Sequence, residues 1–65
     1  MCYILSYELI DDPNTEHEVE IKAEFDDSAI RLAARHMHSV GTGAVLWASL
    51  TDRQGAEVAS SWELL

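Results

Sequence analysis

Residues 17–40 read HEVEIKAEFDDSAIRLAARHMHSV, and the spacing of their apolar side chains changes once along the way. Up to Phe25, apolar or aromatic side chains alternate with acids and one lysine, which predicts a strand with one buried side. After Asp26 and Asp27, apolar residues recur three and four positions apart as far as Val40, which predicts an amphipathic helix. The stretch therefore predicts a strand that leads directly into a helix.

Signals for the two ends of this helix are present in the sequence. Asp26 and Asp27 can accept hydrogen bonds from free backbone N–H groups, and their charge suits the positive end of the helix dipole. Gly41 can adopt the left-handed conformation that often follows a last helical turn. The residues expected on the buried stripe between these ends are Ile30, Ala33, Ala34, Met37 and Val40.

A first hairpin is predicted before the helix. Residues 2–10 (CYILSYELI) alternate in the manner of a half-buried strand, and residues 17–25 form its expected partner. Residues 11–16 (DDPNTE) combine Pro, Asn and acids, which favour a turn between the two strands.

A second hairpin is predicted after the helix. Its strands are expected at residues 44–51 and 56–64, joined by the sequence DRQG at residues 52–55. Residues 60–63 have the spacing of a helix capping box, but only two residues follow, too few for a stable helix. We therefore expect the last strand to continue to residue 64.

Together these elements predict an α+β fold with the order ββαββ. The economical arrangement is a four-stranded, mainly antiparallel sheet with the helix packed on one face. The 65 residues make one domain, residues 1–65, close to the lower size limit for a single hydrophobic core. A deep substrate pocket is not expected in so small a domain, which favours a binding function over catalysis.

The formal net charge of -8 is concentrated in one part of the chain. Between residues 8 and 27, Lys22 is the single base, whereas acids and bases balance after residue 27. The acids predicted to bind a partner are Glu8, Asp11, Asp12, Glu16, Glu18, Glu20, Glu24, Asp26 and Asp27.

The acidic strand positions allow two interpretations. Side chains two residues apart on a strand face lie about 6.5 to 7 Å apart, so Glu18, Glu20 and Glu24 should form a row that resembles successive phosphates of a nucleic acid. The row could serve solubility alone, although Lys would satisfy that requirement as well as Glu. The alternative is a docking surface for a basic protein whose Lys and Arg side chains otherwise hold phosphates.

Metal binding and catalysis are not predicted, and no cofactor is expected. His36 and His38 lie two apart on the predicted helix and point in directions about 200° apart, so they cannot hold one ion with Cys2 and His17. The clustered carboxylates lie on an open strand and loop, whereas acid–base catalysis needs a cleft that separates their pKa values.

The third predicted strand carries apolar residues on both sides. Val45 and Trp47 alternate with Leu46, Ala48 and Leu50, yet one helix covers one face of a sheet. The outer side of this strand is therefore either partly exposed or a patch for a partner. The patch would suit a small regulatory or structural module, such as an antitoxin or a dimerising subunit, and we expect a monomer or a weak homodimer.

The lone Cys2 excludes an internal disulfide, and the sequence has no long apolar segment that could cross a membrane. We therefore expect a cytosolic protein. The net negative charge also repels nucleic acid and anionic membranes, which indicates either a cationic partner or a role in solubility alone.

The whole chain resembles the small acidic anti-CRISPR proteins of phages and mobile elements. The resemblance lies in the length, the α+β pattern, the absence of catalytic motifs, and the acidic row flanked by further acids. DNA-mimicking members of that class occupy basic channels of a CRISPR-Cas effector and block target binding, and this chain looks most like those directed at type I complexes. The resemblance implies a protein partner in the cytoplasm of a bacterial host cell, with no direct contact to nucleic acid.

Overall fold

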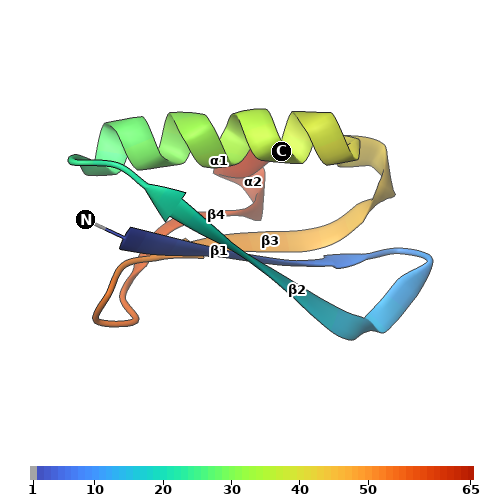
Figure 1. Cartoon of the computed structure of the whole chain (residues 1–65). Coiled ribbons are helices and arrows are strands. Elements are labelled where there is room, and N and C mark those ends of the chain that lie inside the picture. Colours follow the sequence, from blue (N-terminus) through green and yellow to red (C-terminus); the bar gives the residue numbers. More distant parts are fainter. Residues whose placement is uncertain (1) are drawn as a thin grey trace.

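The computed structural model describes residues 2–65 and shows a sheet with one long helix across one face (Figure 1). The elements in chain order are β1 (Cys2–Leu9), β2 (Asp12–Lys22), α1 (Asp26–Val40), the short 3-10 helix η1 (Thr42–Ala44), β3 (Val45–Thr51), β4 (Glu57–Ser60) and α2 (Ser61–Leu64). The sheet has four strands in the order β2-β1-β3-β4, and each neighbouring pair is antiparallel. The α+β class and the ββαββ order are confirmed.

The core lies between the sheet and α1. β1 is a central strand, and its residues Tyr3, Leu5 and Tyr7 are buried while the residues between them are not. α1 contributes Ala29, Ala33 and Met37, and the small alanine side chains let the helix approach the sheet closely. The remaining buried apolar residues are Ile21, Val45, Ala48, Leu50, Ala59 and Leu64. Of the predicted helix stripe, Ala33 and Met37 are fully buried, and Ile30 and Val40 pack against this core.

The first hairpin is tighter than predicted, and the expected turn at residues 11–16 is wrong. β2 begins at Asp12, so the turn consists of Ile10 and Asp11. The pairing then shifts, because β2 holds extra residues between the partners of Tyr7 and Leu9. Pro13 fits into this strand because β2 is an edge strand with a bulge, where a missing backbone N–H breaks no ladder bond.

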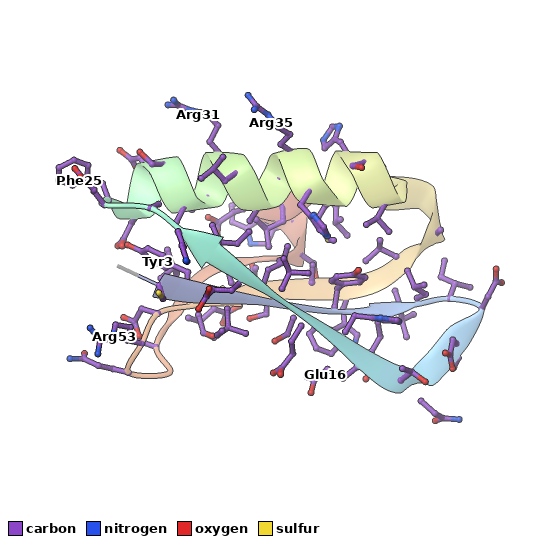
Figure 2. The ribbon with its side chains drawn as sticks, viewed as in Figure 1. Tyr3, Glu16, Phe25, Arg31, Arg35 and Arg53 are labelled. Carbon is purple, nitrogen blue, oxygen red and sulfur yellow. The ribbon has the colours of Figure 1, made fainter. Side chains whose placement is uncertain are left out.

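The predicted end of the second strand is also wrong. β2 stops at Lys22, and the chain leaves the sheet before Phe25. Phe25 has an extended backbone at the N-cap position of α1, and 67% of its surface is exposed. Its side chain lies at the start of α1, outside the core (Figure 2). The alternation that continues to residue 25 therefore belongs to the sheet only as far as Lys22.

A bulge in β3 explains why its apolar residues do not simply alternate between the two faces of the sheet. Glu8 pairs with Trp47, whereas the next residue of β1, Leu9, pairs with Val45, so Leu46 is an extra residue in β3. Because of this insertion, Val45 is buried on the same face as Ala48. Leu46 is 52% exposed. Trp47 belongs to the face away from α1 and is partly exposed.

The predicted strand at residues 56–64 is wrong beyond Ser60, where the chain turns into α2 on the same side of the sheet as α1 (Figure 1). The Ser61 hydroxyl accepts a hydrogen bond from Ala48 N at 2.8 Å and donates one to Ala48 O at 3.0 Å. One side chain thus bonds both backbone groups of Ala48 where the β4 ladder ends. Leu64 then reaches the core with 1% of its surface exposed, and this burial stabilises a helix too short to persist alone.

Two glycines occupy positions that require a positive φ. Gly41 ends α1 with φ 104° and donates its N–H to Met37 O at 2.9 Å, as its place after the helix predicts. Gly55 has φ 85° in the turn between β3 and β4, where the Asp52 carboxylate accepts hydrogen bonds from the backbone N–H groups of Gln54 and Ala56.

Candidate partner-binding surface

The face of the sheet opposite α1 is the surface on which the acidic strand residues gather. In β1, Ile4, Ser6 and Glu8 alternate with the buried residues and therefore lie on this open face. The register places Glu20 beside Ile4 and Glu18 beside Ser6. Glu16 projects to the same side of the sheet (Figure 2).

A further carboxylate completes this surface from the opposite edge. Glu57 of β4 pairs with Thr51, which itself pairs with Ile4, so its side chain lies on the open face. The Ser49 hydroxyl donates a hydrogen bond to Glu57 Oε1 at 3.5 Å. The distribution of net charge along the sequence does not identify Glu57, because acids and bases balance in this part of the chain. We call the set Glu8, Glu16, Glu18, Glu20 and Glu57 the acidic face.

The centre of the open face, between the acids of the two edge strands, is mostly small and polar. Ser6 of β1 pairs with Ser49 of β3, which pairs with Ser60 of β4. Three antiparallel strand spacings separate Glu20 from Glu57, which corresponds to about 14 Å. The acidic face therefore has carboxylates on both edge strands and serine hydroxyl groups between them.

The other acids predicted to bind a partner lie elsewhere. Asp11 is in the turn of the first hairpin, and Asp12 pairs with Leu9, which packs against the core on the helix side. Glu24 lies between β2 and α1, and Asp26 and Asp27 form the first turn of α1. The nine predicted acids thus form three groups, and the structure brings four of them together on the open face.

Asp26 takes part in an internal hydrogen bond. Asp26 and Asp27 lie in the first turn of α1, at the positive end of its dipole as predicted, but the start of the helix has no side-chain cap, so the capping hydrogen bonds predicted for both acids are wrong. Asp26 Oδ1 instead accepts a hydrogen bond from the Tyr3 hydroxyl at 2.7 Å. This hydrogen bond, burial, and the negative charges of Asp26 and Asp52 raise the pKa of Tyr3 to about 12 from its ordinary value of 10.0. Asp26 therefore helps to join the start of α1 to the central strand.

The Tyr3–Asp26 bond predicts a specific response to alkaline pH. The folded state holds the Tyr3 proton more tightly than the unfolded chain, so this contribution to stability is complete below pH 10.0 and is lost as pH rises to about 12. The free energy of unfolding, measured by urea titration with circular dichroism, should fall over this interval. Tyr3→Phe should flatten that fall, whereas Tyr7→Phe should retain it. An equal fall in all three proteins would contradict the assignment.

Most of the basic side chains lie away from the acidic face. Arg31 and Arg35 project from the side of α1 that faces away from the sheet, and Arg53 lies in the turn between β3 and β4 (Figure 2). Lys22 is the base at the acidic face, where its Nζ lies 3.9 Å from Glu20 Oε1. Both side chains are more than half exposed, so this pair contributes little and leaves Glu20 accessible.

Two of the three histidines lie against an aromatic residue of the core. His17 stacks on Tyr7 with ring centroids 5.1 Å apart, and His36 lies tilted against the same ring at 6.1 Å. Their Nε2 atoms are buried without a hydrogen-bond partner in the described part of the chain. Cys2 lies at the far end of β1, beside Lys22, and residues 2–65 contain no cluster of metal-binding side chains.

The two larger hollows of the described surface flank the sheet. One, of about 420 Å³, is lined by Cys2, Tyr3, Asp52, Arg53 and Gln54. The other, of about 460 Å³, is an open groove between β2 and α1. Across the described residues, no helix has the length and apolar character needed to span a membrane.

Comparison with protein-family models, with curated proteins and with solved structures finds no match to this chain.

Proposed function

We propose that this protein is an anti-CRISPR inhibitor that places its acidic face in a basic nucleic-acid-binding channel of a CRISPR-Cas effector. The favoured target is a type I surveillance complex, whose binding to target DNA would be blocked. The observation that carries the proposal is the placement of five carboxylates on an uncovered sheet face, three along β2, one on β1 and one on β4, with two arginines on the opposite side of the molecule. This polarity gives the inhibitor one side that a cationic channel attracts.

The dimensions of the acidic face support mimicry of a nucleic acid. Glu16, Glu18 and Glu20 follow one another along β2 about 6.5 to 7 Å apart. Across the sheet, the distance of about 14 Å to Glu57 is similar to the roughly 12 Å width of the major groove of B-DNA. The face therefore presents one row of negative charge along β2, as one backbone of a nucleic acid does, with Glu57 as a single carboxylate across the sheet.

The chemistry of binding follows from the exposed carboxylates. Arg side chains that hold phosphates can form bidentate pairs with Glu, because the planar guanidinium matches both anions. Long-range attraction between the negative face and a positive channel accelerates the encounter, and added salt screens it. The interaction is thus one of protein with protein in the cytoplasm of a bacterial host cell, and the protein itself makes no contact with DNA.

A module that binds through apolar contacts around Trp47 is the competing interpretation. The large apolar residues that the strand register assigns to the open face of residues 2–65 are Ile4 and Trp47, both partly buried. Trp47 stands beside Glu8, and serines occupy the centre of the face. The larger share of charged and hydroxyl groups favours the electrostatic proposal.

The direct test is target-DNA binding by a purified type I surveillance complex with increasing amounts of this protein. We expect DNA binding to be lost at low salt, with weaker inhibition at moderate salt. Capture of proteins from lysates of CRISPR-bearing bacteria tests whether another effector type is the target. If no effector is captured or inhibited even at low salt, the proposed function is wrong.

A further inference from the structure

β2 offers a long, unpaired edge of the sheet. It has eleven residues, pairs with β1 on one side, and has no neighbour on the other side among residues 2–65. Every second residue of an edge strand directs its backbone N–H and C=O groups away from the sheet, where another strand can bind them. The opposite edge, β4, has four residues and gives much less room for such pairing.

The groove between β2 and α1 runs beside this edge. Its apolar lining comes from Val19 and Ile21 of β2 and from Leu32 of α1, whose side chain is 39% exposed. Arg35, Ser39 and His36 of α1 also line the groove, and His36 carries the buried Nε2 atom without a hydrogen-bond partner. Side chains of a strand added to β2 would enter this groove on the helix side of the sheet.

We propose that the β2 edge binds an extended partner segment in which basic and apolar residues alternate, as an additional strand of the sheet. Side chains directly opposite on neighbouring strands have Cβ atoms about 4.5 to 5.5 Å apart. On the open face, the added strand would therefore place its basic side chains beside Glu16, Glu18 and Glu20. On the other face, its apolar side chains would cover Val19, Ile21 and Leu32.

A second copy of this chain does not suit the same edge. Pairing of β2 with the β2 of another copy would place two rows of glutamates side by side, and like charges opposite one another destabilise a sheet. The charge pattern thus selects a basic partner. The inference rests on the proposed function in this one respect, the basic character of the partner.

The test uses a peptide in which Lys and Val alternate, titrated into the whole protein by calorimetry and by NMR. We expect binding together with protection of β2 backbone amides from hydrogen exchange. N-methylation of alternate peptide bonds should weaken binding at least about tenfold, since each lost backbone hydrogen bond contributes. A peptide with its lysines in one block is the control for charge alone.

Two variants of the protein test whether the peptide binds in the groove or at another exposed apolar residue. Leu32→Ser should weaken binding of the alternating peptide several-fold, whereas Leu46→Ser, at an exposed residue of the β3 bulge, should not. Equal binding of the alternating and blocked peptides, or no protection of β2, would overturn the inference. Inhibition of an effector is measured separately, so failure of the peptide to bind β2 can be distinguished from failure of the proposed function.

Discussion

Simultaneous replacement of Glu16, Glu18 and Glu20 by lysine is expected to abolish inhibition of the CRISPR-Cas effector. These three side chains are exposed on the open face of β2. Loss of one partner from a desolvated charge pair at an interface costs about 2 to 5 kcal/mol, and lysine adds repulsion against a basic channel. The three losses together should therefore lower the affinity by at least about a thousandfold, measured as the concentration needed to block target-DNA binding.

The matched control replaces Asp11, Glu24 and Asp27 by lysine. It changes the formal net charge by the same amount, at residues that lie in the hairpin turn or near the start of α1. We expect inhibition to weaken modestly, because long-range attraction decreases while the close contacts persist. Circular dichroism should show that both variants fold. If the two variants inhibit equally, net charge and not the acidic face determines binding.

Leu64→Ala is expected to cause the largest loss of stability among the conservative substitutions near the end of the described chain. Leu64 is 1% exposed and connects α2 to the core. Truncation of a buried leucine to alanine costs about 2 to 5 kcal/mol, and a core of this size rarely supplies more than about 3 to 5 kcal/mol. The variant should be largely unfolded at room temperature, as measured by urea denaturation with circular dichroism.

The neighbouring residue provides the control for this prediction. Leu65 has the same side chain but is 39% exposed, so Leu65→Ala should cost far less. A small and equal loss in both variants would mean that α2 does not pack on the core. That outcome would favour the extended strand that the sequence pattern predicts for residues 56–64.

The elements with strong local periodicity could be predicted, whereas those that depend on distant contacts could not. α1 follows from the spacing of its apolar residues and from Gly41, both of which act within one helix. The sequence does not reveal that β2 is an edge strand, and this position is what allows Pro13 inside it. α2 was missed because its stability comes from Ser61 bonding to Ala48 and from Leu64 in the core.

The residues of the candidate site could likewise be predicted only where local spacing determines their position. Glu18 and Glu20 share a face because alternation is local, and the structure agrees. Glu57 joins them through the pairing of three other strands, which residue spacing alone does not specify. Asp26 leaves the predicted group because Tyr3, 23 positions away in the sequence, donates a hydrogen bond to it.

The strand order has a consequence for the kinetics of folding. The hairpin of β1 and β2 is local, and isolated hairpins form in about 1 to 10 μs. β1 must also pair with β3, where Ile4 and Thr51 meet across 47 residues of chain. Closing a loop of that length costs about 3 kcal/mol in chain entropy. We therefore expect association of the first hairpin with β3 to limit the refolding rate, and substitutions along the β1–β3 seam to slow refolding more than those at either edge strand.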